Sequence, residues 1–126
     1  MVVVSGDRRI RAFKATEAFT VEAYRVSATL TRNGSAGLIE AIREVAVRSG
    51  GALVAATASP AGGSAERRLL ERARERMIEV RYYLYLARRL GMLDVKRYRG
   101  LTLRQDAALR EMERLLSQRP AAARPP

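Results

Sequence analysis

Apolar residues recur at steps of three and four positions along most of the chain, which is the spacing of one face of an α-helix. A half-buried strand would show strict alternation of apolar and polar residues, and no such run occurs in the sequence. The spacing predicts four helices, over residues 9–31, 36–58, 64–91 and 94–118. Because the connections between them are short, we expect an all-α fold, an up-down-up-down four-helix bundle.

Each predicted helix has a row of residues that should face the bundle core. The row of the third helix is the most regular, and Leu69, Tyr83 and Leu90 flank it. An apolar stripe of this width suits a bundle better than a two-stranded coiled coil. The predicted core rows are Ile10, Phe13, Thr20, Val21, Tyr24 and Ala28; Leu38, Ile42, Val45, Ser49, Leu53 and Ala56; Leu70, Ala73, Met77, Val80, Leu84 and Ala87; and Tyr98, Leu101, Gln105, Ala108, Met112 and Leu115.

Residues that favour helix ends mark the boundaries of the third and fourth helices. Ser64 is the expected N-cap of the third helix, and Gly91 its C-terminal stop. Asp94 is the expected N-cap of the fourth helix, with Thr102 as an alternative further along. These residues place a short turn between the two helices.

The chain of 126 residues is the length of one domain. We expect a flexible N-terminal lead over residues 1–8, a bundle over 9–118 and a disordered tail over 119–126. Asn33-Gly34-Ser35 predicts a turn between the first two helices, and Gly50-Gly51 weakens the second helix by about 1 kcal/mol per glycine.

Histidine and cysteine are both absent, which removes the side chains that most often act as general bases, nucleophiles and transition-metal ligands. The pairs Glu40/Glu44 and Glu71/Glu75 have the spacing of paired carboxylates, but arginines lie three or four residues from each. We therefore interpret them as surface ion pairs. The sequence predicts a protein that is not an enzyme and binds no cofactor or metal.

No apolar run approaches the roughly 18 residues that a membrane-spanning helix needs. The N-terminal segment Met1–Val4 is too short for the apolar core of a signal peptide. We expect a cytoplasmic protein without a membrane partner.

The formal net charge is +11, from 24 basic and 13 acidic residues. All basic residues except Lys14 and Lys96 are arginines, whose planar guanidinium binds phosphates and carboxylates in a fork geometry. A GC-rich genome would also favour arginine over lysine, but it does not explain the excess of positive charge. More than half of this excess, a net charge of +6, lies within residues 62–100.

Arginines recur every seven residues along the third helix and form one stripe about 30 Å long, away from the core row. Tyr85 falls on the same face, where its ring can stack on a base or a sugar. A row of positive charge binds nucleic-acid backbones through release of counterions. The candidate nucleic-acid-binding residues are Arg67, Arg74, Arg81, Tyr85, Arg88, Arg89, Lys96, Arg97 and Arg99.

Two other interpretations of this face remain open. Glu71, Glu75 and Glu79 can neutralise part of the stripe through pairs three or four residues apart, which would leave an ordinary solvated surface. Ile78 and Tyr85, with Tyr82 nearby, lie among the arginines and instead favour a subunit interface.

Several segments resemble a family of small bacterial four-helix-bundle proteins encoded within intervening sequences of large-subunit ribosomal RNA genes. The resemblance is most specific over Leu84–Leu93, which is similar to the end of that family's third helix. It departs from the family over Arg48–Ala56, which lacks the Pro, Asn and Glu that the family carries there. The other matching segments are Ile10–Lys14, Glu22–Arg25, Gly37–Leu38, Ile42–Val47, Tyr98 and Met112–Leu116.

This resemblance implies a bundle that assembles into a ring, commonly a homopentamer, without catalytic activity. A related branch, the accessory variability determinants of diversity-generating retroelements, consists of basic pentamers that bind a reverse transcriptase and nucleic acid. The leading hypothesis is therefore a homo-oligomeric basic bundle that binds RNA or DNA within a ribonucleoprotein. The alternative is a protein-binding scaffold, such as an accessory subunit of a reverse transcriptase.

Overall fold

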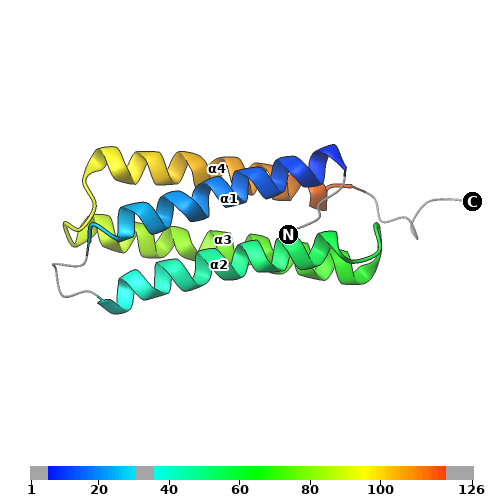
Figure 1. Cartoon of the computed structure of the whole chain (residues 1–126), viewed down its shortest axis with the longest axis horizontal. Coiled ribbons are helices and arrows are strands. Elements are labelled where there is room, and N and C mark those ends of the chain that lie inside the picture. Colours follow the sequence, from blue (N-terminus) through cyan, green and yellow to red (C-terminus); the bar gives the residue numbers. More distant parts are fainter. Residues whose placement is uncertain (1–5, 31–35, 119–126) are drawn as a thin grey trace, which may run out of the picture.

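The computed structural model describes residues 6–30 and 36–118, and within these ranges the chain is all-helical, with no strand. The helices are α1 (Asp7–Ser27), α2 (Ala36–Thr57), α3 (Ser64–Arg89) and α4 (Val95–Leu116). Each runs antiparallel to the one before it, which confirms the up-down-up-down bundle (Figure 1). The predicted bounds agree with these to within about three residues.

The four helices pack in a square. α1 contacts α2 and α4, and α3 contacts the same two helices, whereas α1 and α3 are not in contact, nor are α2 and α4. In Figure 1, α1 and α4 form the upper layer of the bundle, and α2 and α3 the lower layer. Every helix therefore has one core-facing side, two sides against neighbours and one outward side.

Three predictions about chain segments need comment. The predicted lead over 1–8 ends too late, because α1 already begins at Asp7. The predicted turn at 33–35 and the predicted tail at 119–126 lie outside the described residues. No helix in the described ranges is both long enough and apolar enough to cross a membrane.

The core rows predicted for α2, α3 and α4 are confirmed almost without exception. Leu38 and Tyr98 are partly buried against the core, and all the other residues of those three rows are buried. Of the flanking residues, Leu69 and Tyr83 also pack against the core, whereas Leu90 is exposed. Steps of three and four placed these residues correctly because large aliphatic side chains mark the buried side of each helix.

The core row predicted for α1 is wrong. Phe13 is only partly buried, and Val21 and Tyr24 are exposed. Small side chains dominate the true seam, which lets α1 approach its neighbours closely but produces little hydrophobic contrast in the sequence. The residues of α1 that are buried are Ala12, Thr16, Phe19, Ala23, Val26 and Ser27.

Glycine ends α3 as predicted. Gly91 has φ +76°, a conformation that other residues adopt only with strain. Its N–H donates to the Arg88 carbonyl at 3.1 Å, and the Met92 N–H donates to the Ala87 carbonyl at 2.9 Å. This pair of hydrogen bonds is the Schellman motif, which closes the helix and turns the chain toward α4.

The start of α3 differs from the prediction. Gly63 occupies the N-cap position and no side chain caps the helix there, so Ser64 is its first helical residue and not its cap. The Glu66 carboxylate accepts a hydrogen bond from the Gly62 N–H at 2.9 Å and thereby satisfies one of the free amides at this end.

Asp94 caps α4, as predicted, because its Oδ1 accepts a hydrogen bond from the Arg97 N–H at 2.7 Å. Replacing Asp94 with alanine should lower the free energy of unfolding by about 1 kcal/mol. Thr102, the alternative cap, lies inside α4, where its hydroxyl donates to the Arg99 carbonyl. The Thr102→Ala variant should therefore change little, and chemical denaturation of both variants measures the difference. An equal loss in the two variants would argue against this cap.

Two buried polar side chains connect neighbouring helices. The Ser49 hydroxyl of α2 donates to the Ala73 carbonyl of α3 at 2.7 Å. The Gln105 amide of α4, which is fully buried, donates to the Met77 carbonyl of α3 at 2.6 Å. Because each buried polar group is satisfied, these contacts fix the register of α3 against both of its neighbours.

Candidate nucleic-acid interface

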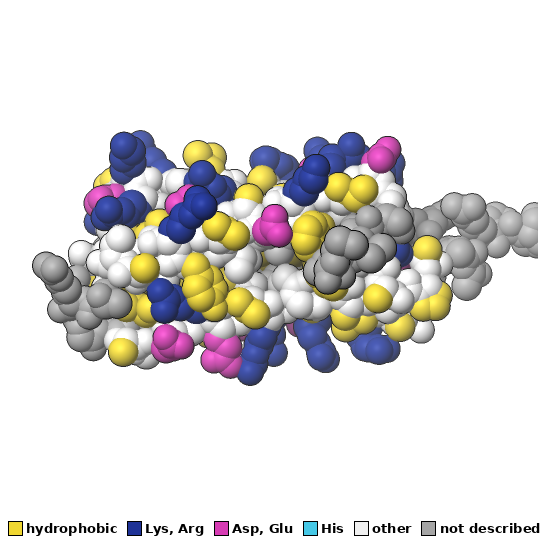
Figure 2. All heavy atoms as spheres, in the orientation of Figure 1, with side chains coloured by type: hydrophobic (Ala, Val, Ile, Leu, Met, Phe, Trp, Pro, Cys, Tyr) yellow, Lys and Arg dark blue, Asp and Glu magenta, His cyan; other side chains and the backbone are white. Residues whose placement is uncertain are grey.

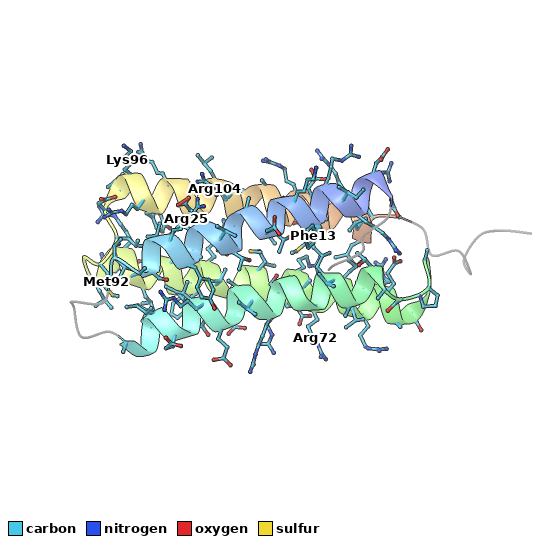
Figure 3. The ribbon with its side chains drawn as sticks, in the orientation of Figure 1. Phe13, Arg25, Arg72, Met92, Lys96 and Arg104 are labelled. Atoms are coloured by element: carbon cyan, nitrogen blue, oxygen red, sulfur yellow. The ribbon has the colours of Figure 1, made fainter. Side chains whose placement is uncertain are left out.

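Positive charge is unevenly distributed over the four helices. α3 carries eight basic and four acidic residues, α4 six and three, and α1 five and three, whereas α2 carries two of each. Figure 2 shows Lys and Arg side chains along the upper edge, over α4, and along the lower edge. Arg72 of α3 points away from the bundle at this lower edge (Figure 3). The net positive charge of the described residues therefore comes from α1, α3 and α4.

The arginine row of α3 faces α4. The Arg67 guanidinium donates to the Leu116 carbonyl at 2.8 Å, at the C-terminal end of α4. Fourteen residues later in α3, Arg81 pairs with Asp106, and its Nε lies 3.3 Å from Oε1 of Gln105. The row predicted to face outward therefore lies beside the contact between α3 and α4.

The four arginines of this row differ in how far they are engaged. The side chains of Arg67 and Arg81 keep 46% exposure each. Arg74 is partly buried, and its Nε has neither solvent contact nor a hydrogen-bond partner in the described structure. Arg88 is exposed and donates to the Leu93 carbonyl at 3.4 Å. Only part of the row is therefore available to an anionic ligand.

A second group of basic residues lies where α3 ends and α4 begins. Arg89 is exposed at the last position of α3, and Lys96 and Arg99 are exposed in the first turns of α4. Arg97 lies 3.5 Å from the Asp94 carboxylate, through its Nη1, and is also exposed. The short Asp94-capped turn brings these predicted residues to one end of the bundle.

The structure adds two basic residues that the sequence analysis did not select. Arg104 of α4 lies 3.6 Å from Glu22 of α1, and Arg25 follows Glu22 by one helical turn. Figure 3 shows Arg25, Arg104 and Lys96 near this end of the bundle. Arg97 and Arg104 are seven residues apart, so spacing alone could have linked them, whereas Arg25 joins the group only because α1 packs on α4.

A shallow hollow of about 390 Å³ separates α1 from α4 at this end. Three of its lining residues are basic and two are carboxylates, so it is polar and mixed in charge. Its lining residues are Glu22, Val26, Asp94, Lys96, Arg97, Gly100, Leu101 and Arg104.

The side of α3 that faces α2 is neutralised by carboxylates. Arg76 lies 3.1 Å from Glu79, and the Tyr83 hydroxyl donates to the same carboxylate at 2.6 Å. The hydrogen bond from Tyr83 is the main cause that lowers the pKa of Glu79, and Arg76 adds to it. Glu79 is therefore ionised at neutral pH and offsets the charge of Arg76.

Other predicted ion pairs also form. Glu40 lies 3.9 Å from Arg43, Glu44 lies 2.6 Å from Arg48, and Glu71 lies 3.3 Å from Arg67. Within the described ranges, no group of three or more Asp, Glu, His or Cys residues is arranged to hold a metal ion. These carboxylates therefore serve as partners of arginines.

Tyr85 is 48% exposed on the outward side of α3, one turn before Arg88 and Arg89. Ile78 and Tyr82 are exposed on the same side. The aromatic ring is therefore accessible beside the basic end of the bundle.

No protein-family model matches this chain, and no curated protein or solved structure is similar to it.

Proposed function

We propose that this chain is a non-enzymatic, homo-oligomeric basic bundle that binds RNA or DNA through the sugar-phosphate backbone, as part of a ribonucleoprotein. The observation that supports this most is the exposed basic group at the junction of α3 and α4, where Asp94 is the one acidic residue within 88–99. Arg88, Arg89, Lys96, Arg97 and Arg99 would contact phosphates, and Tyr85 would stack on a base or sugar.

The arginines that face α4 have a secondary role in this proposal. Arg67 and Arg81 already bind groups of α4, so they contribute mainly to the positive potential around the site. Arg74 lies between them and is partly buried. This division moves the main contacts from the middle of α3 to one end of the bundle.

Affinity for RNA and DNA should fall steeply between about 50 and 200 mM salt, because each phosphate contact releases counterions. The Lys96→Glu/Arg99→Glu double variant should weaken binding at least about tenfold and lower the salt dependence by about two contacts. Both changes place carboxylates in the first turns of α4, where the helix dipole favours them, so the fold should be retained. A salt series of fluorescence-anisotropy titrations on single- and double-stranded RNA and DNA measures this.

The matched control is Arg68→Glu/Arg72→Glu, which changes the net charge equally at exposed positions in the N-terminal half of α3. It should weaken binding much less than the α4 variant. Equal losses would indicate a general charge effect without a defined site. Absence of binding at low salt would exclude the proposal.

A protein-binding scaffold, such as an accessory subunit of a reverse transcriptase, is the second candidate. An apolar groove between α1 and α2, lined by Phe13, Val21, Val47 and Val54 among others, favours it because a nucleic acid has no use for such a surface. A reverse transcriptase that stays bound in a pull-down after nuclease treatment would support this candidate over the first.

A further inference from the structure

The largely apolar groove between α1 and α2 has a volume of about 380 Å³. Phe13 points from α1 into the space between the two helices (Figure 3). The residues wrongly assigned to the α1 core therefore have a place, since Phe13, Thr20 and Val21 line this groove. The other lining residues are Thr16, Glu17, Val47, Gly50, Gly51, Leu53 and Val54.

The wall that α2 contributes is uncharged. Residues 49–58 contain no Lys, Arg, Asp or Glu, and α2 as a whole has no net charge. In Figure 2 the front of this half of α2 is white and yellow. Two molecules that each carry a net charge of +11 repel one another least when this side lies at their contact.

A complementary convex feature lies on α3. Ile78, Tyr82 and Tyr85 are 52%, 59% and 48% exposed, and their spacing of four and three residues aligns them along one outward ridge. Other exposed apolar residues, such as Leu103 of α4, do not extend this ridge. Three large side chains in a row on one helix are more than the scattered exposure that is normal for a soluble surface.

The groove and the ridge cannot meet within one molecule. The groove lies between α1 and α2, and α3 does not contact α1. The ridge lies on the side of α3 that faces away from the buried row of Met77, Val80 and Leu84. Each feature is therefore open to a second molecule of the same protein.

We infer that the ridge of one copy, formed by Ile78, Tyr82 and Tyr85, inserts into the α1–α2 groove of a second copy. This inference rests on the proposed homo-oligomer and names its two surfaces. The rim of the groove carries Glu17 and no basic residue, whereas the ridge lies on a basic helix, so the charges at the contact are complementary. Because the two surfaces differ, the contact is head-to-tail and generates a closed ring or a filament.

Two variants block the two surfaces separately. Gly51→Arg fills the groove, and the helix tolerates it because nothing lies within 4 Å of the added Cβ. Tyr82→Arg places a charge on the exposed ridge. Light scattering after size-exclusion chromatography should give an oligomer for the unmodified protein and a monomer for each variant. The matched control, Leu103→Arg at an exposed position of α4, should keep the oligomer.

Mixing the two blocked variants tests the head-to-tail geometry. The Tyr82→Arg copy retains a groove and the Gly51→Arg copy retains a ridge, so an equimolar mixture should form a dimer and no larger species. A mixture that stays monomeric would overturn the inference, as would a monomeric unmodified protein or unchanged masses of the single variants. Circular dichroism confirms that both variants are folded.

Nucleic-acid affinity is a separate readout. The Lys96→Glu/Arg99→Glu variant should lose affinity and keep its oligomeric mass, because neither residue lines the groove or the ridge. Nucleic-acid binding by a protein that does not self-associate would contradict this inference alone. Self-association that depends on groove and ridge, without nucleic-acid binding, would contradict only the binding part of the proposed function.

Discussion

Replacing Phe19 with alanine is expected to lower the free energy of unfolding by about 3–5 kcal/mol. Phe19 is 0% exposed in the α1 seam, so the change removes a large buried side chain and leaves a cavity between tightly packed helices. A loss of this size is a large fraction of the total stability of a small domain. Urea denaturation followed by circular dichroism measures it as a shift of the midpoint at constant slope.

Phe13→Ala is the matched control, because it makes the same chemical change one face away on the same helix. Phe13 is partly exposed in the groove, so we expect a loss of about 1 kcal/mol. The sequence pattern alone predicts the opposite order, with Phe13 in the core. A larger loss for Phe13→Ala than for Phe19→Ala would show that α1 is rotated relative to the structure described above.

Replacing Gln105 with glutamate is expected to destabilise the protein by about 2–3 kcal/mol at pH 7. Gln105 is fully buried, and its amide donates to the Met77 carbonyl. A carboxylate would place a charged acceptor against that carbonyl, with Arg81 on its other side as partial compensation. The helix pair α3–α4 would then contain a poorly satisfied buried charge.

The loss caused by Gln105→Glu should depend on pH. Burial raises the pKa of the introduced carboxyl above its value of about 4.3 in the unfolded chain. The variant therefore loses stability as pH rises through this interval and regains it as pH falls toward 4. Gln105→Leu, which introduces no titratable group, should show no pH dependence beyond that of the unmodified protein. Urea denaturation at several pH values compares the two, and identical profiles would argue against a dry environment at this position.

The sequence predicted the helices well because their boundaries have local causes. Asp94 and Gly91 act within a few residues of their own position, through a side-chain cap and a left-handed backbone conformation. The core rows of α2 to α4 are equally local, since aliphatic side chains repeat on one side. Even the buried Gln105 followed from its place in the row, although the row did not reveal its partner, the Met77 carbonyl.

The errors arise where the answer depends on which helices are neighbours. In α1, Ala12, Thr16 and Ala23 are buried because α2 and α4 come close, and nothing in a small side chain marks that closeness in advance. The arginine row was placed correctly on one face of α3, but the sequence does not show that Asp106 and the Leu116 carbonyl of α4 face it. Arg25 and Arg104 were missed for the same reason.

The absence of net charge on α2, beside the positive charge of α3 and α4, gives the bundle an electric dipole directed across its long axis. A long polyanion will orient such a molecule before contact, with α2 turned away from the strand. Molecules bound side by side would then share one orientation, and attachment of one would favour attachment of the next. Binding curves on long strands should therefore be steeper than those on oligonucleotides that hold a single molecule.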